Sequence, residues 1–217
     1  MLLDLDAGES AEETEELWRL ADILAVACGG HAGDEASMER VVRFCAARGR
    51  AIGAHPSYPD RAGFGRTTMA IDEAALRTAV GGQCAALAAI ARRHGVDVAW
   101  VKPHGALYHD AAAHDAIARA VVRGAVDALG EVVVIGPPEG ALRRAAVGYL
   151  REGFADRGTR ADGTLIPRGE PGALVTDPGA AAARVAALAG RADVICVHAD
   201  TPGAVAIARA VRGALDG

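Results

Sequence analysis

The feature that most constrains the fold is a regular alternation of short apolar runs with longer helical segments along the whole chain. Seven runs rich in Val, Ile, Leu and Ala are predicted to be strands: residues 2–6, 22–28, 50–55, 98–104, 131–136, 149–155 and 193–198. Repeated strand–helix units of this kind are typical of a parallel sheet covered by helices. Because 217 residues suit one large domain, we expect a single domain over residues 1–217.

Capping residues mark where several of the predicted helices begin. Ser10 followed by Glu13 predicts a capping box for a helix that runs through Leu20. Two further helices are expected over residues 34–48 and 72–95, where an aspartate starts each helix and a glycine ends it.

Polar side chains stand at, or just past, the carboxyl ends of almost every predicted strand. They are Asp6, His31, His55, His104, Asp156 and His198. In a closed barrel these strand ends meet at one mouth, where catalytic groups collect. In an open doubly wound sheet they would spread along an edge, and ligands would gather at one switch point. Since nearly every strand contributes a polar group, we predict a seven-stranded parallel β/α barrel.

The composition excludes several classes of function. Lys and Arg together number 23 against 28 Asp and Glu, which gives a formal charge of −5 without a basic stripe, so we expect no nucleic-acid partner. No apolar run reaches the roughly 18 to 20 residues of a membrane helix, and we expect no membrane span and a cytoplasmic location. Because 51% of the residues are hydrophobic but only 4% are aromatic, the core must consist of small aliphatic side chains.

Four cysteines lie far apart and form no C-x-x-C pair: Cys28, Cys45, Cys84 and Cys196. This spacing favours neither a zinc ribbon nor a disulfide framework. All four fall in apolar segments, so we interpret them as core residues rather than nucleophiles. His94 and His114 lie in helical segments and are interpreted as solvated or capping residues.

Three motifs place basic side chains just after strands. CGGHAGD presents His31 after the second strand, and GAHPSYPDRAGFGR places His55 at the end of the third. VKPHGALY sets Lys102 and His104 two residues apart, on one face of the fourth strand. Lys102 is the only lysine in a chain whose other basic residues are all arginine, which suggests that its chemistry matters.

Two further motifs bring charged groups to the last two strands. EGFADR supplies Asp156 and Arg157, and VHAD supplies His198 and Asp200. With the histidines and the lysine, these groups suit activation of water and stabilisation of an oxyanion at an acyl or amide carbon. As the alternative, Asp156 and Arg157 form an ion pair that only fixes a loop. The Gly- and Pro-rich stretch 156–172 predicts a long loop near the site.

Five ordered motifs, from Leu3 to near the C-terminus, together resemble the LamB/YcsF family: CGGHAGD, GAHPSYPDRAGFGR, VKPHGALY, EGFADRGTRADGTLIPR and CVHADTPGAVAIA. The resemblance implies a seven-stranded β/α barrel of the glycoside hydrolase/deacetylase type. It also implies an ATP-dependent 5-oxoprolinase activity, in which this chain acts with subunits B and C to open 5-oxoproline to L-glutamate.

The chain departs from the family pattern near the candidate site residues. Four residues differ from the usual ones: Gly30 for an aromatic residue, His109 for Asn, Thr159 for Tyr and Ala199 for Gly. The stretch LDLDAGES is shorter than its family counterpart, so either Asp4 or Asp6 matches a given family aspartate, and we favour Asp6. These departures bear on the substrate rather than on the fold.

The resemblance implies a lactam substrate, whose amide resonance resists hydrolysis. Phosphorylation of the lactam oxygen by ATP would give an activated imidate that water can attack. The chain has no G-x-x-x-x-G-K-[ST] sequence, so we expect a partner protein to bind most of the ATP.

Each candidate residue is given a hypothetical role in ring opening. Asp6 or Asp156 would be the general base for water, and His31 and His55 would orient the water or bind a metal. Lys102 and His104 would stabilise the oxyanion or protonate the leaving nitrogen. The candidate substrate-binding residues are Arg66, Arg157, His198 and Asp200, with Arg157 as a bidentate clamp for the substrate carboxylate.

No metal is assigned to the site. Deacetylase-like hydrolases hold a divalent ion with Asp and two or three His at barrel strand ends, but no H-x-x-x-H or comparable local spacing occurs here. Two other functions stay open. One is a stand-alone amidohydrolase or deacetylase, with or without a metal, and the other is a non-catalytic subunit that completes a larger complex.

Overall fold

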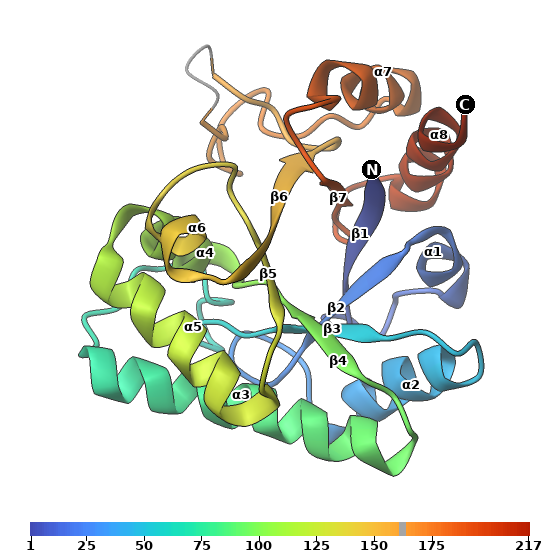
Figure 1. Ribbon diagram of the computed structural model, residues 1–217. Helices are drawn as coiled ribbons and strands as arrows, with labels where there is room; N and C mark the ends of the chain where they lie inside the picture. Colours follow the sequence, from blue (N-terminus) through green and yellow to red (C-terminus); the bar gives the residue numbers. More distant parts are fainter. Residues whose placement is uncertain (161–163) are drawn as a thin grey trace. The chain divides into compact units, whose positions relative to one another are not determined.

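A computed structural model gives the fold of the chain and describes residues 1–160 and 164–217 (Figure 1). Its seven strands form a closed parallel barrel in chain order, which confirms the β/α barrel and excludes the open sheet. The strands are β1 (Leu2–Ala7), β2 (Ile23–Ala27), β3 (Ile52–His55), β4 (Val98–Val101), β5 (Val133–Gly136), β6 (Gly148–Phe154) and β7 (Val194–Val197). Each lies within, or overlaps, one of the predicted runs.

Helices follow the strands; the connection after β4 carries two helices, and the connections after β3 and β6 each carry a long loop before the helix. The helices are α1 (Glu15–Leu20), α2 (Glu35–Ala46), α3 (Glu73–Arg93), α4 (Gly105–Ala113), α5 (Asp115–Leu129), α6 (Ala141–Ala145), α7 (Pro178–Leu188) and α8 (Ala204–Asp216). The long loop predicted over 156–172 follows β6, and its residues 161–163 lie outside the described part of the chain.

The chain divides into two compact units. Unit 1 comprises residues 1–5, 14–23 and 152–217, and unit 2 comprises residues 6–13 and 24–151. Within unit 1, β7 pairs with β1 and with the end of β6, and α8 packs against α1 and α7. Within unit 2, β2, β3, β4, β5 and the start of β6 pair in that order. The single domain stays a prediction.

Small aliphatic side chains build the core, as the composition predicted. All five residues of β2 and all four of β7 are buried. The four cysteines are buried and form no disulfide in the described part of the chain, which fits core residues. Burial raises the pKa of Cys84 to about 12 and that of Cys28 well above its ordinary value, so these two thiols stay protonated and unreactive.

Helix α1 begins later than the sequence predicted. Its N-cap is Thr14 rather than Ser10, and the helix starts at Glu15. The carboxylate of Glu13 closes no capping box but accepts hydrogen bonds from the backbone N–H groups of residues 8–10, at 2.8, 2.8 and 3.0 Å. Three backbone donors of the β1–α1 turn outweigh the single donor that a capping box would offer this carboxylate.

Helices α2 and α3 begin where the sequence predicted. The side chain of Asp34 accepts from the backbone N–H of Ser37 at the start of α2, and Asp72 does the same for Ala75 at the start of α3. These aspartates therefore serve as N-caps.

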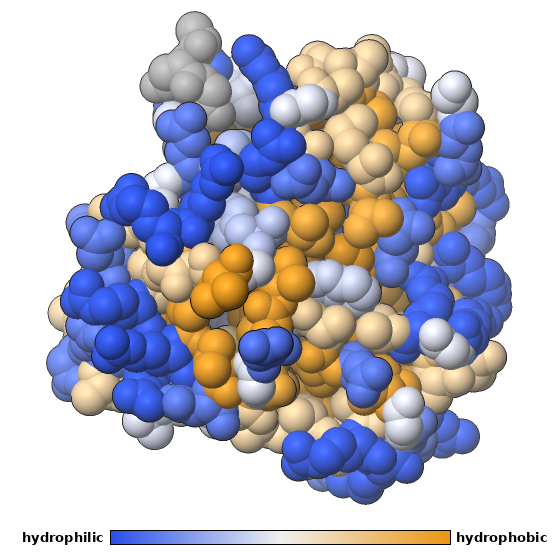
Figure 2. Space-filling view, in the orientation of Figure 1, coloured by the Kyte–Doolittle hydropathy of each residue, from blue (hydrophilic) through white to orange (hydrophobic). Residues whose placement is uncertain are grey.

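In the described part of the chain, α3 is the one helix whose length and hydropathy would allow it to cross a membrane. It packs against α5, and its charged residues pair across that interface: Arg77 lies 2.5 Å from Asp127, and Arg119 lies 3.0 Å from Glu73. The face that α5 occupies in Figure 1 is mixed in Figure 2, with hydrophilic side chains toward the left edge and hydrophobic ones toward the middle of the view. Helix α3 thus has the partners of a helix that packs on a barrel.

Candidate active site

Unit 2 gathers six polar side chains at the carboxyl ends of its strands: Asp6, Glu9, His31, His55, Lys102 and His104. Five of them were predicted, and all five are at most 8% exposed. The sixth, Glu9, was not predicted as a site residue, and its side chain is 10% exposed. Ionisable groups buried this deeply persist only when they are paired, so their mutual contacts define the site.

Two of these side chains follow β4, where strand-like pairing continues beyond the last strand residue. The backbone N–H of Lys102 donates to the carbonyl of Ala54, and that of His104 donates to the carbonyl of Pro56. This extended backbone keeps the two side chains on one face, as their two-residue spacing predicted.

Lys102 pairs with Asp6 inside the protein. The Nζ atom of Lys102 lies 2.5 Å from Oδ1 of Asp6, and the same carboxylate oxygen lies 3.4 Å from Nε2 of His55. The aspartate thus places a negative charge between a lysine and a histidine. Since the aspartate is almost fully buried, its negative charge acts on Lys102 and His55 with little screening by water.

His55 and His104 are held through one ring nitrogen each by a backbone carbonyl. Nδ1 of His55 donates to the carbonyl of Lys102 at 2.7 Å, and Nε2 of His104 donates to the carbonyl of Phe64 at 3.0 Å. The other two nitrogens, Nε2 of His55 and Nδ1 of His104, face each other at 3.0 Å.

The three histidines differ in how their surroundings move their pKa values. Burial lowers the pKa of His104 and of His31, although a hydrogen bond to Glu9 opposes the shift at His31. Burial also acts to lower the pKa of His55, but the charge of Asp6 and a hydrogen bond to it raise that pKa above its ordinary value. His31 and His104 are therefore neutral at pH 7, with ring nitrogens able to accept.

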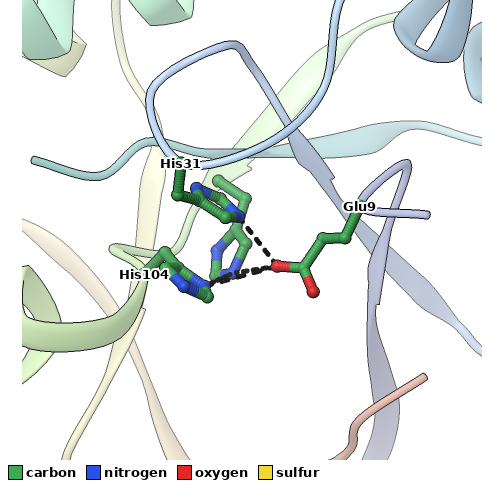
Figure 3. A group of neighbouring side chains, drawn as sticks. Glu9, His31 and His104 are labelled. Atoms are coloured by element: carbon green, nitrogen blue, oxygen red, sulfur yellow. Dashed lines mark hydrogen bonds and ion pairs between the residues drawn. The ribbon is translucent and has the colours of Figure 1, made fainter. Parts of the chain in front are cut away.

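Glu9 reaches into the group of histidines from the turn after β1 (Figure 3). Its Oε1 atom lies 2.8 Å from Nε2 of His31, 3.3 Å from Nδ1 of His104 and 3.7 Å from Nε2 of His55. A signal for this residue was present in the sequence, because Glu9 follows the first strand as closely as the other site residues follow theirs. The stretch LDLDAGES carries three carboxylates close together, and their position near the strand end does not show which of them reaches the histidines.

The loop between β3 and α3 covers the histidines with strained backbone. Phe64 has a φ of 53° and Gly65 a φ of +63°, both in the left-handed region. A Cβ atom at Gly65 would lie 3.0 Å from Cβ of His31 and 3.2 Å from Cδ2 of His104. Only glycine lets this backbone approach both rings so closely.

Unit 1 holds a second polar group, built around Asp156. This carboxylate is fully buried and accepts from the backbone N–H of His198 at 2.9 Å, from Nδ1 of the same residue at 2.9 Å, and from the hydroxyl of Thr201 at 2.6 Å. The ring of His198 also stacks on Phe154, with centroids 5.7 Å apart. Asp156 therefore fixes the tautomer and orientation of His198.

The predicted substrate-binding residues already have partners. Arg157 donates from Nε to the carbonyl of Ala173 and from Nη2 to that of Ile166, so its described hydrogen bonds fix its own loop rather than pair it with Asp156. Burial, followed by the charge of Arg168, lowers the pKa of Arg157. Asp200 forms an ion pair with Arg168 at 2.9 Å.

Arg66, the remaining predicted substrate-binding residue in unit 2, is exposed. Its guanidinium lies over the ring of Phe64, 4.7 Å from the centroid. Two histidines that were interpreted as solvated or capping lie at the surface: His94 pairs with Glu39 at 2.5 Å, and His114 is exposed at the start of α5.

One of the residues that depart from the family pattern, Gly30, lies where the structure leaves no room for a side chain. A Cβ atom there would lie 2.3 Å from Oε1 of Gln83 and 2.4 Å from Oγ of Ser57. The amide of Gln83 bonds to the backbone of Ser57 in both directions, at 3.0 and 2.9 Å. Gln83 thus occupies the space next to position 30, while His109 and Thr159 are exposed.

The chain forms a closed parallel β/α barrel, and a buried lysine–aspartate pair and three histidines beside a glutamate lie at its strand ends. It therefore belongs to the class of barrel proteins with a polar site at the carboxyl ends of their strands. The chain belongs to the LamB/YcsF family, whose family model matches residues 3–217.

Relatives with curated names cover almost the whole chain. Two proteins named as the A subunit of 5-oxoprolinase, from Chloroflexus aggregans and Streptomyces avermitilis, are each 42% identical to it over 99% of its length, covering 94% and 95% of theirs. The crystal structure of the lactam utilization protein from Thermus thermophilus matches with a TM-score of 0.90 and 34% identity, over 100% of this chain and 96% of that one. By their names, these relatives are subunits of a 5-oxoprolinase and a protein of lactam utilization.

Proposed function

We propose that the chain is the A subunit of an ATP-dependent 5-oxoprolinase. With subunits B and C it would open the lactam ring of 5-oxoproline to L-glutamate, while ATP is hydrolysed to ADP and phosphate. The observation that carries the proposal is the buried Lys102–Asp6 pair beside three histidines, in a chain whose relatives are named as the A subunit of 5-oxoprolinase.

Ring opening needs a positive group where the carbonyl oxygen gains charge. Lys102 is held in place by Asp6, so its ammonium can stabilise that oxygen without reorganising in the transition state. Lys102 and His104 are our candidates for protonating the leaving nitrogen: Lys102 carries a proton to give, whereas His104 is neutral and must first accept one at Nδ1.

Water must also be activated, and the two candidate bases differ in their surroundings. Asp6 lies within the buried group of unit 2 and stays our candidate there. Asp156 is fully buried and accepts three donors, so it would act through His198, whose side chain is 14% exposed. A divalent ion held by Glu9, His31, His55 and His104 would supply activation of water when bound.

The remaining parts of the proposal concern partners and location. The chain carries no P-loop sequence, so a partner protein would bind most of the ATP. We also propose that the complex works in the cytoplasm, where free thiols such as the four buried cysteines are common.

The test is to reconstitute the reaction from purified chains and to omit each component in turn. The purified chain is mixed with its candidate B and C partners, and glutamate formed from 5-oxoproline is measured with and without ATP and with each chain left out. Glutamate that appears only with ATP and all three chains supports the proposal. A folded, assembled mixture that forms none contradicts it and directs attention to the departures at Gly30, His109 and Thr159.

A second candidate function is a stand-alone amidohydrolase or deacetylase. The group of Glu9 with three histidines favours it, because such a set can hold a metal that activates water without ATP. Hydrolysis of a small amide by the chain alone, lost on chelation, would establish this candidate. A third, non-catalytic function would require 5-oxoproline binding that no substitution at Lys102 or His104 changes.

A further inference from the structure

Four donor atoms in unit 2 converge on one point. They are Oε1 of Glu9, Nε2 of His31, Nε2 of His55 and Nδ1 of His104, and all lie within 4.8 Å of one another. The separations from Glu9 are 2.8, 3.7 and 3.3 Å, and the two ring nitrogens of His55 and His104 are 3.0 Å apart. Ligands about 2.0 to 2.1 Å from a tetrahedral zinc ion are roughly 3.3 Å from each other, so these distances bracket the expected value.

The protons of two rings are directed away from this point. Carbonyl oxygens only accept, so Nδ1 of His55 and Nε2 of His104 must carry hydrogen to bond to Lys102 and Phe64. When both rings are neutral, their other nitrogens turn lone pairs toward each other and toward the carboxylate of Glu9. Lone pairs in this arrangement repel unless a positive species lies among them.

The surroundings match those of metal ligands in proteins. Ligating histidines usually donate their second N–H to a carbonyl or carboxylate, and this fixes the tautomer. His55 and His104 both do so. Glu9 is positioned in turn by Glu13, which accepts from the backbone N–H groups of the turn that carries it. We infer that Glu9, His31, His55 and His104 bind one divalent transition-metal ion of the zinc type.

His31 is the ligand that must adjust. Its ring is stacked on that of His104, with centroids 3.6 Å apart and planes at 2°. Two parallel rings cannot both aim an in-plane lone pair at one ion, so one ring has to turn. Nδ1 of His31 is buried without a hydrogen-bond partner among the described residues, whereas His104 is held by Phe64, so His31 turns.

A proton is the competing occupant of the same point. A hydrogen placed between Nε2 of His55 and Nδ1 of His104 would also relieve the repulsion, and it would need no metal. The inference does not depend on ring opening, because metal binding by the purified chain is measured without substrate, ATP or partner proteins.

The test measures metal binding directly. The full chain is stripped with a chelator, dialysed against Zn²⁺ or Co²⁺, and its metal content is determined by mass spectrometry. The same measurement is made on Glu9→Gln and His31→Gln, with His94→Gln as the matched control, since it removes a histidine that pairs with a glutamate at the surface. Thermal unfolding of each metal-free variant shows that it is folded.

We expect one ion per chain, a Co²⁺ spectrum of a four-coordinate nitrogen and oxygen site, and wild-type affinity in His94→Gln. Glu9→Gln and His31→Gln should each lose more than the roughly 10- to 100-fold that removal of an outer partner costs. If dialysis removes all metal, the space between the four donor atoms holds a proton rather than an ion, and the inference is overturned. Equal affinity in all variants, or a sulfur ligand that points to Asp4, Glu152 and Cys196 in unit 1, would overturn it as well.

Discussion

Lys102 Nζ lies 2.5 Å from Asp6 Oδ1, and neither side chain is more than 5% exposed. Replacement of Lys102 by Met would leave the aspartate buried without its lysine. We expect ring opening to be abolished and the free energy of unfolding to fall by about 3 to 5 kcal/mol, the usual cost of breaking a buried ion pair. Urea denaturation and the glutamate assay measure the two effects.

The double variant Asp6→Asn/Lys102→Met separates stability from chemistry. It removes both charges, so we expect much of the lost stability to return while ring opening stays absent. Ring opening by either Lys102→Met variant would remove Lys102 from the mechanism.

Glu13 organises the turn that carries Glu9. In Glu13→Gln, an amide replaces a carboxylate that accepts three backbone N–H groups, and one of its two acceptor oxygens becomes a donor. We expect a loss of about 1 to 3 kcal/mol in unfolding free energy. Glu12→Gln is the control, because Glu12 is exposed. Equal stability of the two variants would show that the turn does not depend on Glu13.

Asp156 should make stability depend on pH. Burial acts to raise its pKa, but the charge of His198 and the hydrogen bonds from His198 and Thr201 lower it below the ordinary value. A carboxylate with a lowered pKa contributes stability that is fully present above its unfolded pKa, about 3.9, and is lost as pH falls through its folded pKa. The stability difference between wild type and Asp156→Asn should therefore be fully present near pH 5 and shrink below about pH 4.

Urea titrations across that pH range measure the difference, and Asp200→Asn serves as the control. Asp200 is an exposed partner of Arg168, so its replacement should cost less than about 1 kcal/mol at any pH. A difference for Asp156→Asn that grows as the pH falls below about 4 would contradict the assigned direction.

Gly30 and Gln83 should be energetically coupled. A methyl group at position 30 would meet the amide of Gln83, which is held by Ser57, so Gly30→Ala should cost about 1 to 3 kcal/mol. Gln83→Ala removes the obstacle along with its hydrogen bonds. The double variant should then cost less than the sum of the two single variants, and simple additivity in urea denaturation would show that Gln83 does not restrict position 30.

The sequence predicted the barrel because each strand carries its own signal. A run such as ILAVA in β2 is buried on both faces and reads as a continuous apolar segment, whatever lies elsewhere in the chain. The polar residues that follow these runs were found for the same reason, since position after a strand is a local property. His31, His55 and His104 were named as candidates from that position and from the motifs that contain them.

The convergence of the four side chains in unit 2 was beyond local reasoning. Glu9, His31, His55 and His104 lie on four separate segments, so no short spacing such as H-x-x-x-H could mark them as one group. The predicted start of α1 was wrong for a related reason. The carboxylate of Glu13 does accept from the backbone N–H of Ser10, but the fold of the turn gives it two further backbone donors that the capping pattern does not include.

The measurement that tests the central claim most directly is the rate of glutamate formation by the three-chain complex carrying His104→Gln, beside the same complex carrying His94→Gln. Each substitution removes one histidine that contacts a glutamate, one in the buried group of unit 2 and one at the surface. We predict that His104→Gln lowers the rate by about 100-fold or more, the usual contribution of a positioned acid or base, while His94→Gln keeps the wild-type rate. A His104→Gln complex as active as wild type would contradict the assignment of ring opening to this site.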